Sequence, residues 1–267
     1  MAGKRLVDQK RLRAKKKRRL FFISLYLFFF VGLIVCGLSY VSSLSTFQIK
    51  GLTVVGVERE SSAHIASIVR SSLMGRYIWL FPRASTLIYP KVQIEKELLM
   101  LPIVQSVDIS HVGFTGLEIG IVERSETSQW CDVNDLCYSI DGEGFIFDKV
   151  ASSTTFKYRG LIEDSPVGKS FLPEETFKNI GFFIRELKNM SLLPVEARLS
   201  SNDYVEVLLL SGGKLIIYTK DDLSIVLTTL QSIVADKQIA SSTEEFLSNL
   251  DYLRLDAGNK VTYKKKN

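Results

Sequence analysis

The feature that most constrains this chain is a run of 25 residues, 20–44, that contains no charged side chain. At about 1.5 Å per residue, this run forms a helix of roughly 37 Å, which can cross a hydrocarbon core of about 30 Å with some tilt. A helix that is apolar on every face has no place on the surface of a water-soluble protein. The sequence therefore predicts a transmembrane helix over residues 20–44.

The preceding residues, 1–19, form a basic tail. They hold ten Lys or Arg and one acid, Asp8, a net charge of +9, whereas the whole chain carries +5. Residues 20–267 therefore carry a net charge of −4. Since the basic character belongs to the tail alone, we expect no nucleic-acid binding. Beside a membrane, such a tail sets topology and contacts anionic lipid; a specific cytoplasmic partner is the alternative.

Topology follows from the basic residues on either side of the span. Only two basic residues, Lys50 and Arg59, occur in the fifteen residues after it. Because basic residues favour the cytoplasmic side, we expect a cytoplasmic N-terminus and an exported body. A cleaved signal peptide is the alternative, but its apolar region usually spans only about 7–15 residues. The sequence favours an uncleaved anchor and a single-pass protein of the cell (cytoplasmic or inner) membrane.

The first exported segment, residues 47–123, has the order β-α-α-β-β. The expected elements are a strand over 47–55, a helix from Ser61 or Ser62 to near Gly75, a helix from Pro90 to Pro102, and strands over 104–110 and 117–123. In the second helix, the apolar positions expected to face inward are Val92, Ile94, Leu98 and Leu101. This order predicts a small α+β domain with helices on one side of a three-stranded sheet.

Residues 124–264 have shorter strands and more turn signals. Expected strands cover 127–131, 137–140, 145–148, 195–199, 204–210, 214–219, 250–256 and 260–264. Apolar periodicity predicts one helix over 173–188 and another that begins at Asp221 or Asp222 and continues to Val234. The second domain is thus expected to be β-rich with helices on one side, which makes the whole chain α+β.

Residues suited to catalysis are few. His64 and His111 have no Cys or acid at the spacing that metal ligands or a catalytic triad require. Gly168-Lys169-Ser170 matches only the end of a phosphate-binding loop. We therefore expect no catalytic residues, no metal site and no cofactor, and hence a protein that is not an enzyme.

Two exported cysteines enclose a short loop. Cys131 and Cys137 end and begin two expected strands, whereas Cys36 lies in the apolar run. If the strands pair, the two thiols face each other at a distance that a disulfide can bridge. The sequence favours a Cys131–Cys137 disulfide over two free buried thiols.

In their order along the chain, several short motifs resemble those of the FtsQ/DivIB cell-division proteins. The matching segments are Phe47-Gln48-Ile49, Val54-Val55-Gly56, Leu101-Pro102-Ile103-Val104, Glu123-Arg124 with Trp130, Asp141 to Phe145, Tyr252 to Asp256, and Gly258 to Tyr263. The chain departs from the family at Arg254 and Asp256, where the family has Asp and Arg. It also has Glu126 near the family's usual Pro, and Gly113 to Gly116 in place of a Trp-Pro turn.

This resemblance implies a POTRA domain over 47–123 and an FtsQ/DivIB-type β domain over 124–264. It also implies a non-enzymatic scaffold of the bacterial divisome, located at the septum, that recruits FtsB-like and FtsL-like bitopic proteins and contacts other divisome proteins. The alternatives are a POTRA-containing assembly or secretion component and a membrane-anchored cell-wall hydrolase.

A strand near a chain terminus tends to lie at a sheet edge, where it can accept a partner strand. The candidate partner-binding residues are Tyr252, Leu253, Leu255, Val261 and Tyr263. Because successive side chains of a strand face opposite sides, about half of these five are expected to lie in the core instead.

Overall fold

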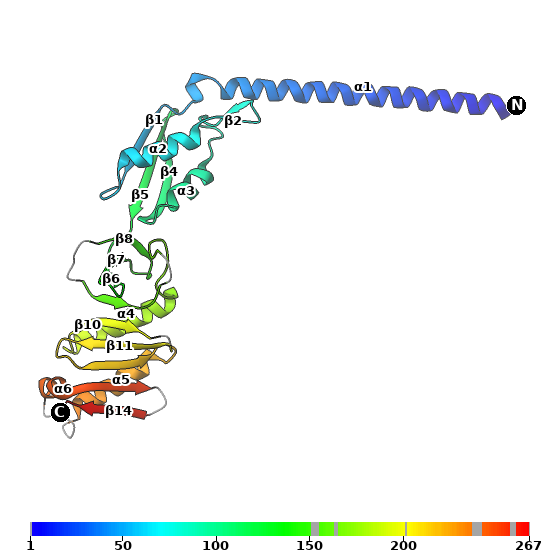
Figure 1. Ribbon diagram of the computed structural model, residues 1–267. Helices are drawn as coiled ribbons and strands as arrows, with labels where there is room; N and C mark the ends of the chain where they lie inside the picture. The colour runs from blue at the N-terminus through cyan, green and yellow to red at the C-terminus, as the bar shows by residue number, and fades with distance from the viewer. Residues whose placement is uncertain are drawn as a thin grey trace. The chain divides into compact units, whose positions relative to one another are not determined.

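The computed structural model describes residues 2–150, 155–162, 165–200, 202–236, 242–256 and 260–266, and the side chains of all of these except 2–18, 256 and 260. It shows an α+β protein with one long N-terminal helix (Figure 1). The chain forms two compact units. The first comprises Met1–Leu101 and Ser106–Val122, and the second comprises Pro102–Gln105 and Glu123–Asn267.

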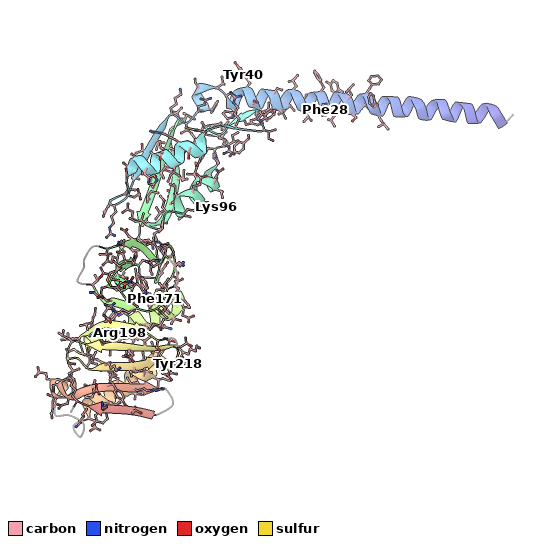
Figure 2. All side chains as sticks on the ribbon, in the orientation of Figure 1. Phe28, Tyr40, Lys96, Phe171, Arg198 and Tyr218 are labelled. Carbon is pink, nitrogen blue, oxygen red and sulfur yellow. A yellow bond between two sulfur atoms is a disulfide. The ribbon has the colours of Figure 1, made fainter. Side chains whose placement is uncertain are left out.

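Helix α1, Ala2–Ser42, contains the apolar run. Its segment Arg19–Ser42 is long and apolar enough to cross a membrane, with a mean hydropathy of 2.6. Large side chains such as Phe28 and Tyr40 point outward along it, 79% and 72% exposed (Figure 2). A helix with apolar side chains exposed on every side suits a lipid environment, which is consistent with a single-pass membrane protein.

After α1, the first unit forms a three-stranded sheet with two helices. Its elements are η1 (Ser45–Phe47), β1 (Gly51–Val55), α2 (Ser62–Leu73), β2 (Arg76–Tyr77), β3 (Phe81–Pro82), α3 (Lys91–Leu99), β4 (Val104–Val112) and β5 (Gly116–Glu123). The sheet order is β1-β5-β4, and β1 runs parallel to β5, with Gly51 opposite Gly116. β2 and β3 form a separate small hairpin that the sequence had not predicted.

Burial in this unit follows helical periodicity with one exception. Ile65 and Val69 of α2 and Ile94 and Leu98 of α3 are fully buried, because these i, i+4 pairs point to the same side of each helix. Val92, expected to face inward, is 63% exposed, so that expectation was wrong. Two residues before Ile94, it lies on the opposite side of a helix that has only nine residues.

The second unit is built on a nine-stranded sheet in the order β14-β13-β12-β11-β10-β9-β6-β7-β8. Its strands are β6 (Ser128–Cys131), β7 (Cys137–Ile140), β8 (Ile146–Lys149), β9 (Lys157–Arg159), β10 (Pro194–Leu199), β11 (Tyr204–Leu209), β12 (Lys214–Tyr218), β13 (Leu250–Asp256) and β14 (Lys260–Lys265). Its helices are α4 (Glu174–Asn189), α5 (Leu223–Ala235) and α6 (Thr243–Asn249). The sequence had not predicted β9 or α6.

One hydrophobic core joins these helices to the sheet. The apolar residues at helical spacing in α4 are buried, and so is Phe183, which is 0% exposed; those at helical spacing are Phe177, Ile180, Ile184 and Leu187. Along β11 and β12, alternate residues such as Val207 and Leu215 point into the same core. The side chains between them point to the opposite face, which is partly exposed. The sheet therefore has one face in the core and one face partly open to solvent.

Candidate functional site

The predicted partner-binding residues belong to the hairpin β13–β14, at one end of the nine-stranded sheet. β14 is the edge strand, whereas β13 is paired on both sides, parallel to β12 and antiparallel to β14. α5 packs against β13, and Phe246 of α6 is buried in the same core. The hairpin is thus fixed to the body of the sheet through β13 and presents only β14 outward.

Two of the five predicted residues cannot contact a partner. Leu253 and Leu255 on β13 are 0% and 1% exposed and belong to the hydrophobic core, where about half of the five candidates were expected to lie. Their alternation with Tyr252 and Arg254 is that of a strand with one buried face, and both sides of β13 are already paired with other strands. Tyr252 is half-buried on the other face.

Val261 and Tyr263 are the two predicted residues on the edge strand itself. They are 40% and 43% exposed and lie opposite Leu255 and Leu253. Because cross-strand pairs share a face, their side chains extend the helix-covered face to its last strand. They remain partly exposed there, although Tyr263 also lies against Phe246 and Leu250 in a small hollow. These two side chains are therefore the apolar positions that a strand added beyond β14 would meet.

The two edges of the sheet differ. The edge at β8 is covered, because the Ile146 N–H donates to the Lys169 carbonyl at 2.9 Å and the Gly168 N–H donates to the Ile146 carbonyl at 2.8 Å. No such bonds cover the outer side of β14 within the described ranges. An edge strand without a covering segment keeps half of its backbone donors and acceptors available for another strand.

One hydrogen bond fixes which amides of β14 point outward. The Lys266 N–H donates to the Asn249 carbonyl at 2.8 Å, and therefore points toward the β13 side. Backbone direction alternates along a strand, so the amides of Lys264 and Thr262 also point toward β13. We infer that the N–H and C=O groups of Val261 and Tyr263 point away from the sheet.

Lysines give this edge a positive charge. Lys264 and Lys265 are exposed, and the Lys264 ammonium lies 2.9 Å from a carboxylate oxygen of Asp251. This hydrogen bond lowers the pKa of the Asp251 carboxyl and raises that of Lys264. Lysines on an edge strand discourage pairing between identical chains, since like charges would face each other. They leave pairing with an acidic strand favourable.

An aromatic cluster on the open face of the sheet connects β11, β12 and β13, the strands that precede the edge strand β14. The rings of Tyr204 on β11 and Tyr218 on β12 are 5.1 Å apart, and the Arg254 guanidinium on β13 lies 4.7 Å from the centre of the Tyr204 ring. Arg254 also donates to the Tyr204 hydroxyl at 2.8 Å. No pattern in the sequence predicts this cluster, because its members are up to 50 positions apart. The Asp256 side chain, the other half of the Arg254–Asp256 charge exchange, lies outside the described residues, as do Gly258 and Asn259.

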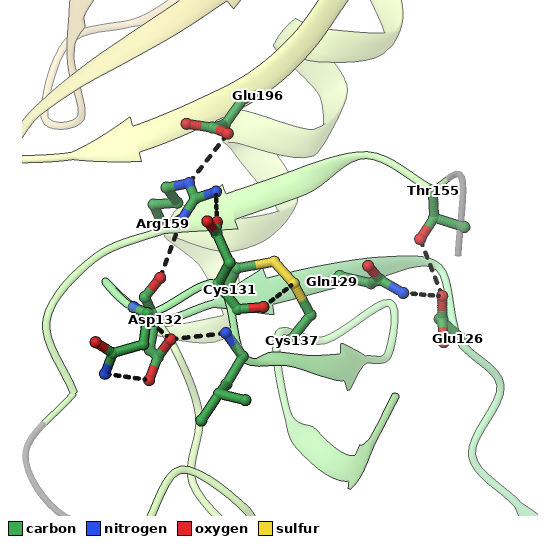
Figure 3. Close-up of a disulfide and its surroundings, with 11 residues drawn as sticks. Glu126, Gln129, Cys131, Asp132, Cys137, Thr155, Arg159 and Glu196 are labelled. Carbon is green, nitrogen blue, oxygen red and sulfur yellow. Dashed lines mark hydrogen bonds and ion pairs between the residues drawn. A yellow bond between two sulfur atoms is a disulfide. The ribbon is translucent and has the colours of Figure 1, made fainter. Parts of the chain in front are cut away.

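The disulfide predicted between Cys131 and Cys137 is present (Figure 3). It links the end of β6 to the start of β7, where the two residues are directly paired. Arg159 on β9 holds the enclosed loop, because its guanidinium donates to the Asp132 carbonyl at 2.9 Å and lies 2.5 Å from the Asp135 carboxylate. The same guanidinium lies 3.0 Å from Glu196 on β10.

Arg159 also changes the pKa values of its partners. Its hydrogen bond lowers the pKa of the exposed Asp135 carboxyl. At Glu196, burial acts to raise the pKa, but hydrogen bonds from Arg198 and Arg159 outweigh it and the pKa is lowered. The sequence predicted the disulfide but not the arginine that joins its loop to the centre of the sheet.

Two motifs of the sequence meet at the start of the second unit. Arg124 forms a salt bridge with Asp141, and its guanidinium lies 4.2 Å from the centre of the Phe145 ring. Asp141 in turn accepts hydrogen bonds from the backbone N–H groups of Glu143 and Phe145, at 2.9 Å and 3.0 Å. The Glu123-Arg124 segment and the segment from Asp141 to Phe145 therefore form one contact, in which Asp141 orders a turn and binds the arginine.

The histidines are apart from each other and from the cysteines. His64 Nδ1 lies 3.0 Å from the carboxylate of Glu60, four residues earlier, so the expectation that no acid is suitably spaced from His64 was wrong. His111 packs edge to face against Tyr89, with ring centres 5.2 Å apart. Among the described residues, no three His, Cys, Asp or Glu side chains come together in a way that could hold a metal ion.

Comparison of the sequence with models of known protein families, and with curated proteins, gave no match.

Proposed function

We propose that this chain is a bitopic scaffold of the bacterial divisome, similar to the FtsQ/DivIB proteins, with a POTRA-type arrangement in its first exported unit. Its role is to bind FtsB-like and FtsL-like proteins and to hold them at the site of septal cell-wall synthesis. The order of a membrane-spanning helix, a β-α-α-β-β unit and a larger sheet supports this proposal. So does the contact of Arg124 with Asp141 and Phe145, which joins two of the family-like segments.

The observation that carries the proposal is the uncovered edge of β14. A partner that adds a strand there gains hydrogen bonds from the outward amides of Val261 and Tyr263 and contacts with their half-exposed side chains. The lysines at 264 and 265 favour a partner segment with acidic residues. Strand addition needs no catalytic group and no preformed cavity, so it suits a protein whose role is to bring other proteins together.

A pair of variants at one position tests this mode of binding. Val261→Pro removes the outward N–H and places a ring on the edge, whereas Val261→Ala keeps the N–H and shortens only the side chain. Proline is tolerated on edge strands when its missing N–H faces solvent. We therefore expect both variants to melt within a few degrees of the original protein, with only the proline variant losing co-purification with FtsB-like and FtsL-like proteins.

The outcome decides between strand addition and other contacts. Equal co-purification of the two variants and the original protein would show that β14 is not the binding edge. Deletion of residues 250–267 is a poorer test, since it also removes the core residues Leu253 and Leu255. A fluorescent fusion of the full chain should gather at mid-cell, and uniform membrane fluorescence in dividing cells would argue against a divisome role.

A further inference from the structure

The end of the first unit that joins α1 presents a group of exposed apolar side chains. Ile78 and Trp79 form the tip of the β2–β3 hairpin and are 85% and 91% exposed. Leu87 in the next loop is 61% exposed, and Phe114 in the β4–β5 turn is 77% exposed. We propose that these side chains insert into the outer leaflet of the membrane that α1 crosses, so that the first exported unit is held against the lipid surface.

The position of the hairpin relative to α1 supports this inference. The Ser39 hydroxyl of α1 donates to the Leu80 carbonyl at 2.7 Å. A hydrocarbon core of about 30 Å takes up about 20 helical residues, and counting from Leu20 places its outer boundary near Ser39. The hairpin tip therefore lies at the depth of the outer lipid head groups, where tryptophan is enriched in membrane proteins.

The last turn of α1 is packed against the rest of the unit, so the depth of α1 in the membrane also sets the depth of the hairpin. Ser42 in the last turn is only 3% exposed, although the helix before it is open on all sides. The chain that follows pairs with the loop after the hairpin, because the Thr86 N–H donates to the Phe47 carbonyl and the Ile49 N–H donates to the Ala84 carbonyl, both at 2.8 Å. The loop that carries Leu87 is thus tied to the residues directly after the membrane span.

The turn that carries Phe114 lies at the same end of the unit. The N–H of Lys50 donates to the Thr115 carbonyl at 2.8 Å, and Gly51 is the partner of Gly116 in the parallel pair β1–β5. Two segments that are distant in the sequence, the hairpin and the β4–β5 turn, therefore both place an aromatic side chain beside the exported end of α1.

The backbone of the hairpin tip is unusual for its sequence. Ile78 and Trp79 have φ values of 48° and 62°, a region that is unfavourable for an ordinary residue and least suited to a β-branched one. Neither side chain recovers this cost by burial within the chain, since both are almost fully exposed. The turn itself requires these φ values, since the Leu80 N–H donates to the Tyr77 carbonyl at 3.0 Å and a hairpin turn of this kind needs positive φ at both central residues. It leaves an isoleucine and a tryptophan at its exposed tip.

The charge of this segment fits a lipid surface. Between Met74 and Pro90 the sequence has two basic residues, Arg76 and Arg83, and no acidic residue. The Arg83 guanidinium lies over the Tyr77 ring, 5.1 Å from its centre. The backbone N–H of Arg83 donates to the Gly75 carbonyl across the base of the hairpin. Arginines beside an apolar tip can bind lipid phosphates while the tip enters the acyl region.

Fluorescence of the full chain in single-copy nanodiscs tests the inference. Trp130 is buried, 3% exposed, so Trp79 is the tryptophan that lipid or solvent can reach. Lipids brominated high on the acyl chain should quench most of the Trp79 emission, and the Trp79→Phe variant should lose this quenching. In the Trp79→Phe background, Phe114→Trp should restore it.

Met100→Trp in the same background is the matched control. Met100 is 76% exposed, but it precedes β4, whose nine residues carry the chain about 30 Å to the turn of Phe114. This tryptophan should not be quenched by brominated lipid. Equal quenching at 79, 114 and 100, or Trp79 open to an aqueous quencher, would overturn the inference. So would Trp79 shielded from both quenchers, which would indicate a protein contact instead. The inference rests on α1 crossing the membrane and is independent of the proposed division partners.

Discussion

Removal of the Cys131–Cys137 disulfide should destabilise the second unit by an amount that the loop length sets. The two residues are 6 positions apart. In the chain-entropy treatment, closing a loop of this size in the unfolded state corresponds to about 7 cal/mol/K, or about 2 kcal/mol at 25 °C. For a unit of this size, a loss of 2 kcal/mol lowers the melting temperature by about 4–8 °C.

The variant for this measurement is Cys131→Ala/Cys137→Ala in the Trp79→Phe background, where Trp130 is the remaining tryptophan. Trp130 is buried beside Cys131 and therefore reports unfolding of this sheet. Urea unfolding followed by its fluorescence should show a lower free energy of unfolding with an unchanged slope against urea. Cys36→Ala, a change within the apolar helix, is the matched control and should leave the unfolding curve unchanged.

Two results would refute this reasoning. If the double variant unfolds within about 0.5 kcal/mol of the parent, the loop is already ordered without the bond, and the contacts of Arg159 with Asp132 and Asp135 carry the constraint. If alkylation of unreduced protein labels three thiols instead of Cys36 alone, the disulfide does not form.

Three further predictions concern the sheet. Leu253→Ala should lower the free energy of unfolding by about 2–5 kcal/mol because it opens a cavity in the core. Tyr263→Ala on the edge should lower it by less than about 1 kcal/mol. Similar losses for the two variants in urea unfolding would contradict the assignment of core and edge. Arg159→Gln should lower stability at pH 7 by more than at pH 3. The pKa values of Asp135 and Glu196 lie below their ordinary 3.8 and 4.5, so the stabilisation by Arg159 is complete above those values and is lost as the pH falls. A difference in stability from the parent that does not depend on pH would exclude this mechanism. Arg185→Gln on the exposed side of α4 is the control. Arg124→Ala should destabilise the second unit by about 3–5 kcal/mol in the same assay, since it leaves the buried Asp141 without its cation, and a loss below about 1 kcal/mol would show that the turn alone satisfies the carboxylate.

The parts of the fold that the sequence predicted are those with a long or strict apolar period. In α4, Phe177, Ile180, Ile184 and Leu187 recur at helical spacing, and the helix ends within one residue of the prediction. β11 and β12 alternate buried and half-buried residues throughout, and both were predicted within one residue of their bounds. The apolar run of α1 needed only its length and its lack of charge.

The elements that were missed are short or depend on distant residues. β9 has three residues, and its place between β6 and β10 comes from parallel pairing with strands far away in the chain. α6 has seven residues, and its buried Phe246 alone cannot set a period. The hairpin tip at Ile78 and Trp79 uses positive φ values that the sequence of a β-branched and an aromatic residue argues against.

The sequence predicted the two strands that carry the candidate residues, but not which of them is the edge. A terminal hairpin suggested an edge, but two strands with the same apolar content cannot be told apart from sequence alone. The parallel pairing of β12 with β13, across α5 and α6, decides that β13 is internal and β14 is not. For the same reason Leu253 and Leu255 belong to the core, while Val261 and Tyr263 remain half exposed.

The strand order has a consequence for the timing of assembly. From β10 to β14, each strand of the sheet is added beside the previous one in the order of synthesis, and β14 is made after every other strand described. Until Lys260–Lys265 has paired, the end of the sheet is β13, whose outer side bears none of the lysines of β14. The lysine-bearing edge of this sheet therefore forms only after every other described strand of the sheet has been made.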